Sequence, residues 1–168
     1  MARLLLLLAG FWLGILMASW VMATVNFRTV DRVLGPGVRP EMAARLEPIA
    51  VEDRRIVLRH LASEINRWMF RSWAIAQLVL GALALVAAGR LSGPARGLAG
   101  AALLLVVIQL AVLTPAIASV GRSIDFLPRP LAPEVGRRFG ILHAAYVGAD
   151  FAKAILVALS AWSVARRP

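Results

Sequence analysis

The stretch LAGAALLLVVIQLAVLTPAIASV, residues 98–120, runs for 23 positions without a charged side chain. An α-helix rises about 1.5 Å per residue, so roughly 20 apolar residues cross the hydrocarbon core of a bilayer. Further long apolar stretches lie at 4–25 and 73–89, and a fourth, interrupted by a few polar residues, lies at 138–165. The sequence therefore predicts an all-α integral membrane protein that folds as a four-helix bundle.

The composition supports this class and argues against several functions. Hydrophobic residues make up 60% of the 168-residue chain, and the mean hydropathy of +0.77 exceeds that of ordinary soluble domains. Cysteine is absent, which leaves no thiol for catalysis, disulfides or metal binding. The formal charge of +10 comes mostly from arginines outside the apolar stretches, where basic side chains set topology and contact lipid headgroups. We expect one membrane domain, 1–168, in contact with the lipid bilayer, and no nucleic-acid partner.

The first apolar stretch, 4–25, has two possible interpretations. Arg3 precedes a leucine run and small residues follow at 18–23, as in a cleaved signal peptide. The stretch is longer than the roughly 7–15 apolar residues of a typical signal peptide, so we expect a retained span. Trp12 and Trp20 are then expected inside this span or near its outer end, where aromatic belts form.

Small residues recur at four-residue spacing in two of the spans. Such spacing lets transmembrane helices approach closely, so we interpret the small residues as packing signals. Chance repetition in an Ala-rich and Gly-rich span is the alternative. The residues concerned are Gly10, Gly14 and Ala18 in the first span, and Gly97 and Ala101 near the third.

A polar connection, 26–72, joins the first two spans. Turn and helix-breaking signals, Gly35-Pro36-Gly37 and Pro40, predict the end of any helix that extends out of the first span, and Pro48 adds a break. Between 51 and 72 apolar residues recur at helical spacing, which predicts an additional amphipathic helix. This helix either lies along the headgroups or continues into the second span, and the lack of a breaker favours continuity. Its apolar positions are Val57, Leu61, Ile65, Trp68 and Met69.

Polar residues of this amphipathic helix also follow helical spacing: His60, Glu64, Arg67 and Arg71. A solvated helix face is the simplest interpretation of this group. The two histidines of the chain, His60 and His143, have no close His or carboxylate spacing that would indicate haem or metal binding. We therefore predict no cofactor and no metal.

Turn signals also set the topology. Residues 90–96 predict a short turn between the second and third spans, and Pro128, Pro130 and Pro133 exclude regular structure until about Glu134. Four spans place both termini on one side, with five Lys or Arg residues there, against nine in 26–72 and four in 121–138. The positive-inside rule thus predicts cytoplasmic long loops. The Arg-rich and Lys-poor composition is typical of a GC-rich bacterium, so we expect a bacterial inner membrane.

The fourth span carries the strongest candidate site. His143, Tyr146, Asp150 and Lys153 are spaced by 3, 4 and 3 residues and fall on one helical face. Ionisable groups at membrane depth are costly unless they are paired or hydrated, so this face should point into the bundle or toward water. Asp150 and Lys153 are the expected ion pair.

Three interpretations of this polar face remain open. It could be a proton relay or small-solute site; it could be an interhelical latch that Gln77 or Gln109 satisfies; or it could lie shallow, with Lys153 reaching the headgroups. Depth distinguishes them. Counting roughly 20 residues back from Arg166 places Asp150 only about one turn inside the bilayer.

Short motifs in the second half resemble a known family. Leu113-Thr114-Pro115 closes the third span, and Arg138-Phe139 and Leu142-His143 open the fourth. This pattern resembles an uncharacterised four-helix membrane family that includes the animal transmembrane protein associated with cisplatin resistance. The connection at 26–72 is longer than that family leads us to expect. The resemblance implies a membrane fold without a defined activity.

No catalytic signature occurs in the chain: it has no Gly-x-Ser-x-Gly, no phosphate-binding loop and no His-Glu-x-x-His. No internal repeat indicates an inverted-repeat transporter. We therefore predict a non-enzymatic protein with a structural, accessory or partner-binding role, whose partner is a membrane protein or a second copy of this chain. The alternative is a small channel or transporter whose pathway is lined by the polar face of the fourth span.

Overall fold

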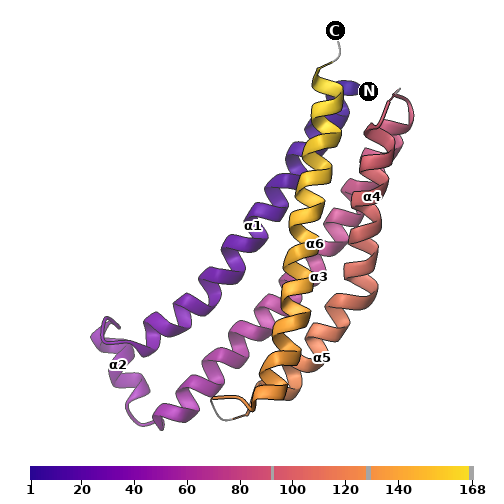
Figure 1. The fold of residues 1–168 in the computed structure, drawn as a ribbon. Helices are drawn as coiled ribbons and strands as arrows, with labels where there is room; N and C mark the ends of the chain where they lie inside the picture. The colour runs from indigo at the N-terminus through magenta and orange to yellow at the C-terminus, as the bar shows by residue number, and fades with distance from the viewer. Residues whose placement is uncertain (92, 128–129, 167–168) are drawn as a thin grey trace.

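Four long helical rods run side by side along the molecule in the computed structural model, which describes residues 1–91, 93–127 and 130–166 (Figure 1). Each rod is long and apolar enough to cross a membrane. The all-α, four-span fold predicted from the sequence is confirmed. The rods are α1 (Ala2–Leu34), α3 (Val51–Gly89), α4 (Ala95–Ile108) continued by η1 (Gln109–Leu113) and α5 (Thr114–Ile124), and α6 (Pro133–Ala165).

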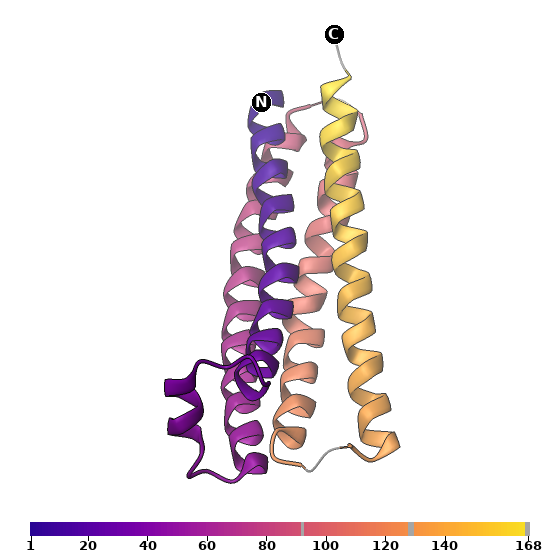
Figure 2. The same ribbon diagram turned by 90° about the vertical axis from the view of Figure 1, so that its left-hand side faces the viewer.

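The four rods form a closed ring of contacts. α1 packs against α3 and α6, and α4 packs against the same two helices from the other side. The chain ends lie together near the α3–α4 turn, whereas the small helix α2 (Pro40–Leu46) lies at the opposite end (Figures 1 and 2). We call these the terminal end and the α2 end. The two views agree that α1 and α6 are close near the terminal end and separate toward the α2 end.

The connection between the first two spans is more ordered than predicted. α1 ends at Leu34, directly before Gly35-Pro36, as the breaker residues indicated. Pro40, interpreted as a breaker, instead occupies the first turn of α2, where its missing N–H costs no hydrogen bond. The amphipathic segment and the second span form the single helix α3, in agreement with the continuity that we favoured. The fourth helix begins at Pro133, one residue earlier than expected.

The terminal half of the bundle holds a tight apolar core. Leu5, Trp12 and Leu16 of α1 are buried against alanines from α3 and α4. Small side chains let these helices approach closely, which favours van der Waals packing in a membrane. The alanines are Ala84, Ala87, Ala88, Ala95, Ala99 and Ala102.

The small residues expected at helix contacts lie elsewhere. All of them are exposed, so the prediction was wrong for contacts within this bundle: Gly10, Gly14, Ala18, Gly97 and Ala101. An Ala-rich and Gly-rich helix repeats small residues on several faces, and the repeat alone does not tell which face packs. The observed contact face of α3 includes Gly81, where a Cβ atom would lie 2.7 Å from Trp12 Cη2.

A short π-helical turn, η1, interrupts the third rod. The backbone N–H of Thr114 bonds to the carbonyl of Gln109, the spacing of a π-helix. Pro115 explains the interruption, because it has no N–H to donate and its ring crowds the carbonyl of Ala111 in a regular helix. Gln109, the first residue of this turn, is the side chain of the third rod that enters the polar network.

Candidate functional site

A polar network lies in the middle of the bundle and receives side chains from all four rods. Its members are Trp12 and Trp20 of α1, Gln77 of α3, Gln109 of η1, and Asp150 and Lys153 of α6. We refer to these six residues as the intramembrane network. Each polar group in lipid needs a partner inside the protein, and the network supplies one to each member.

The ion pair between Asp150 and Lys153 forms the centre of the network. Lys153 Nζ lies 2.8 Å from Asp150 Oδ1, and the side chains are only 1% and 5% exposed, respectively. Lys153 Nζ also donates to Gln77 Oε1 at 2.8 Å. The lysine therefore points into the bundle and does not extend toward the headgroups.

Two further donors complete the coordination of Asp150. Gln109 Nε2 donates to Asp150 Oδ1 and to the backbone carbonyl of Tyr146, both at 3.0 Å. Trp20 Nε1 donates to Asp150 Oδ2 at 3.3 Å. The carboxylate thus connects α6 to η1 and to α1, which is the geometry of an interhelical latch.

The tryptophans of α1 take roles that the sequence did not indicate. Trp12 is buried in the core, and its Nε1 donates to Gln77 Oε1 at 3.2 Å. Trp20 packs on Phe151, with 4.7 Å between ring centroids. Both indoles face the bundle through their N–H groups, so neither side chain belongs to an outward aromatic belt.

Asp150 lies near the middle of α6. At about 1.5 Å per residue, Asp150 is about 17 Å from Phe139 and about 24 Å from Arg166 along α6. α6 has 33 residues and exceeds the 20-residue span used in the count back from Arg166. The partner Gln109 also lies at the midpoint of the apolar stretch 98–120.

His143 and Tyr146 belong to the same face of α6, but their side chains are not part of the intramembrane network. His143 is exposed and stacks on Phe139, with 6.1 Å between ring centroids. The Tyr146 ring packs edge-on against Phe70 of α3. The predicted four-residue site therefore divides into an ion pair and two aromatic side chains nearer the α2 end.

A large cleft occupies the α2 half of the bundle, where α1 and α6 separate. Its volume is about 1850 Å³, and it extends from α2 to the network, with Trp20, Tyr146 and Asp150 among its lining residues. Arginines such as Arg28 and Arg55 line its outer part, and the aromatic residues Trp20, Phe70, Tyr146 and Phe151 line its inner part beside Asp150. We refer to this space as the cleft.

The cleft does not continue past the network. In the terminal half, a void of only about 10 Å³ occurs between α1, α3, α4 and α6, beside Trp12 and Ala99. The apolar core fills the remaining space. Among the described residues, the bundle is therefore open from the α2 end to mid-depth and closed beyond it.

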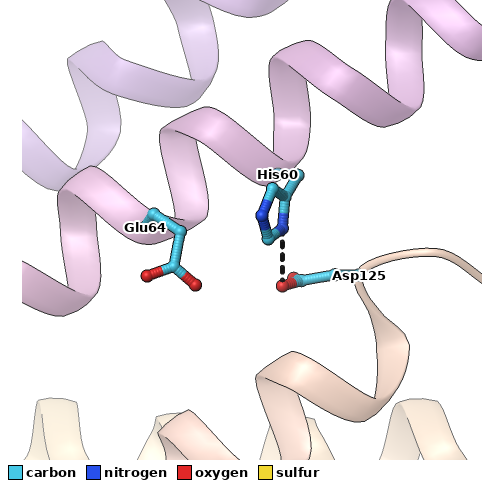
Figure 3. A group of neighbouring side chains, drawn as sticks. All are labelled: His60, Glu64 and Asp125. Atoms are coloured by element: carbon cyan, nitrogen blue, oxygen red, sulfur yellow. Dashed lines mark hydrogen bonds and ion pairs between the residues drawn. The ribbon is translucent and has the colours of Figure 1, made fainter.

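A second polar cluster lies at the α2 end, between α3 and the end of α5. His60 Nδ1 lies 3.0 Å from Asp125 Oδ2, a contact drawn as a dashed line in Figure 3. Arg67 Nη2 lies 2.6 Å from the same oxygen. Arg67 also pairs with Glu64. Asp125 is the member that sequence analysis missed, and Arg71, grouped with these residues there, is exposed. The predicted solvated face is thus in large part a clamp between two helices.

The clamp contains one possible set of metal ligands. One ligand atom from each of His60, Glu64 and Asp125 lies within 4.8 Å of the others (Figure 3). The Arg67 guanidinium is already paired with both carboxylates, and it lies against Gly121, where a Cβ atom would be 3.4 Å from Nη2. A cation would have to displace this seated guanidinium, so the geometry favours an ion-pair clamp.

We expect Asp125→Asn to loosen this clamp more than Glu64→Gln. Asp125 is 6% exposed and holds both His60 and Arg67, whereas Glu64 is 45% exposed. Loss of charged hydrogen bonds from a buried group costs about 1.5–3 kcal/mol, and loss of an exposed pair about 0–1 kcal/mol. Thermal unfolding of both variants in detergent measures the difference. Equal effects would contradict the clamp.

The fold and these two clusters define a multi-pass helical membrane bundle with an internal ion pair and a one-sided cleft. No family model, curated protein or solved structure matches the chain.

Proposed function

We propose that this protein is a non-enzymatic accessory protein of the membrane that binds a partner or ligand in the cleft. The single observation that carries the proposal is the one-sided shape of the bundle. The cleft is open from the α2 end to Asp150, and the terminal half is packed with apolar side chains. A space that is open at one end and closed at the other suits binding better than conduction.

The closed network supports the same conclusion. Asp150 accepts hydrogen bonds from Lys153, Gln109 and Trp20, so its negative charge is compensated without a bound solute. Compensated intramembrane charges hold helices together, and conduction would require breaking several of these contacts at once. We therefore assign the network to structure and the cleft to binding.

The orientation and source also belong to this proposal. The basic loops at the α2 end are consistent with a cytoplasmic location under the positive-inside rule, and the proposed membrane is a bacterial inner membrane. Arg129 and Arg167, two of the residues counted for this rule, lie outside the described residues, as do Ser92 and Pro128 of the turn signals. Membership of the four-helix family named above stays a prediction.

One observation favours the rival function, a small channel or transporter. Asp150 lines the cleft, so the ionisable pair at mid-depth borders a space that reaches the α2 end. A second conformation that opened the terminal half would complete a path across the membrane. His143 and Tyr146 also line the cleft and would lie along that path.

Cysteine labelling distinguishes the two functions, because the chain has no native cysteine. We expect Ala23→Cys, in the cleft wall, to react with a membrane-impermeant thiol reagent only from the α2 side. Ala99→Cys, 2% exposed in the apolar core, should stay unlabelled from both sides of intact membranes. Both variants should label after denaturation, which serves as the control. Labelling at position 99 from the terminal side would favour a pathway, and an unreactive position 23 would contradict the cleft.

A further inference from the structure

The outer face of α3 indicates where the cleft lies relative to the bilayer. Four large apolar side chains on the segment beside the cleft are 42–70% exposed and form one stripe: Val57, Leu61, Ile65 and Trp68. Exposing each of these side chains to water would cost about 1.5–3 kcal/mol relative to burial. The stripe continues into the outer face of the second span at Ile75 and Val79. The outer face of the cleft wall is therefore apolar as far out as Val57, as a surface facing lipid chains or the headgroup region would be.

Trp20 of α1 contacts both Asp150 and Phe151 of α6. Toward the α2 end these two helices diverge (Figures 1 and 2). Beyond Trp20, Phe27 of α1 and Val147 of α6 line opposite walls. Both helices therefore border the cleft, and the gap between them is the candidate route by which a molecule of the bilayer would enter.

The charges of the cleft favour an anionic group in its outer part. Three of the carboxylates that line the cleft are already paired: Asp31 with Arg59, Asp125 with Arg67, and Asp150 with Lys153. Among the described residues, Arg28 and Arg55 also line the cleft and have no carboxylate partner. Glu47 and Glu52 are exposed at the outer rim, next to the end of α2.

One buried atom at this site lacks a partner. Arg59 Nε is buried and makes no hydrogen bond within the described part of the chain, although Arg59 lines the cleft beside Asp31. Buried polar groups almost always find a partner, so an unsatisfied one next to a large space indicates a missing acceptor. A phosphate oxygen is such an acceptor, and arginine is the residue best suited to bind it.

We propose that the cleft takes up an anionic phospholipid from the side, between α1 and α6. The headgroup phosphate lies among Arg28, Arg55 and Arg59, and the acyl chains run along Phe27 and Val147 toward Trp20. The volume of about 1850 Å³ exceeds the roughly 300–1,000 Å³ of ordinary small-molecule sites, as a lipid with long chains requires. This inference rests on the proposed function, and it names the ligand of the same cleft.

Lipid retention tests the proposal on the full-length protein in detergent. Native mass spectrometry would compare phosphatidylglycerol with phosphatidylcholine of identical acyl chains. We expect preferential retention of phosphatidylglycerol, and the double variant Arg28→Gln/Arg55→Gln should weaken it by about fivefold for each arginine removed. The control Arg32→Gln/Arg45→Gln removes the same charge at the same end from residues that do not line the cleft, and should retain the lipid.

A photoreactive phosphatidylglycerol locates the bound molecule. Cross-links from its acyl chain should map to Phe27 and Val147 and decrease in the Arg28→Gln/Arg55→Gln variant, while links to the outer residue Val79 stay unchanged. Equal retention of both lipids, equal loss in the control variant, or links confined to the outer face would each overturn the proposal. If position 23 labels in protein freed of lipid by detergent exchange, such a result rejects the lipid and leaves the binding function standing; if position 23 is unreactive there too, both fail.

Discussion

Replacement of Lys153 by methionine is expected to destabilise the protein by about 3–5 kcal/mol, the usual cost of removing one partner of a buried ion pair. Methionine keeps the length of the side chain but removes the charge that compensates Asp150, which is 5% exposed. The carboxylate would then be buried with only Gln109 and Trp20 as donors, and Gln77 would lose one of its two donors. Thermal unfolding or denaturant titration in detergent measures the loss.

Two companion variants make this expectation specific to the buried pair. The double variant Asp150→Asn/Lys153→Met removes both charges and should recover much of the stability, because a neutral pair needs less compensation. Asp31→Asn breaks an ion pair in which the Asp31 side chain is 60% exposed and the Arg59 side chain is 36% exposed. This substitution should cost about 0–1 kcal/mol. A Lys153→Met protein as stable as Asp31→Asn would mean that water reaches the pair, and would favour the transport function.

The parts of the fold and site that could be predicted have local sequence signals. Four long apolar stretches gave the number of spans, and the spacing of Asp150 and Lys153 indicated an ion pair on one helix face. Gln77 and Gln109 stood out as polar residues in apolar spans, so they were natural partners for that pair. Each of these predictions used a pattern within a single helix or a polar residue within an apolar span. Such a residue needs a partner, because an unpaired polar group is costly in lipid.

The unpredicted parts depend on how helices are rotated and tilted. Trp12 and Trp20 are of the residue type that forms aromatic belts, so their sequence positions suggest a place at the membrane interface. Their N–H groups point inward because of the rotation of α1 about its axis, which the sequence does not reveal. Asp125 is 65 residues from His60, and no periodicity connects them. The cleft lies where α1 and α6 diverge toward the α2 end, a tilt that sequence periodicity does not encode.

The packing role of a glycine likewise depends on helix rotation, and substitutions at two glycines can test it. Glycines on the contact face of α3 and on the lipid face of α1 have similar local sequence surroundings, yet they differ in what surrounds them in space. Gly81 is buried, with Trp12 Cη2 and Leu103 Cδ1 at 2.7 Å and 2.8 Å from the position of a Cβ atom. Gly10 is exposed and has no heavy atom within 4 Å of that position.

Gly81→Leu is therefore expected to lower the stability by about 1–3 kcal/mol or more, the usual cost of overpacking a filled core. A leucine side chain there must displace Trp12, and Trp12 cannot move without losing its hydrogen bond to Gln77. The strain would reach Lys153, which shares the same Gln77 oxygen. Gly10→Leu adds the same side chain toward lipid and should be neutral or slightly stabilising, because glycine is a poor helix former. Unfolding of the two variants in detergent compares them directly, and equal stability would mean that α1 packs on α3 through a different face.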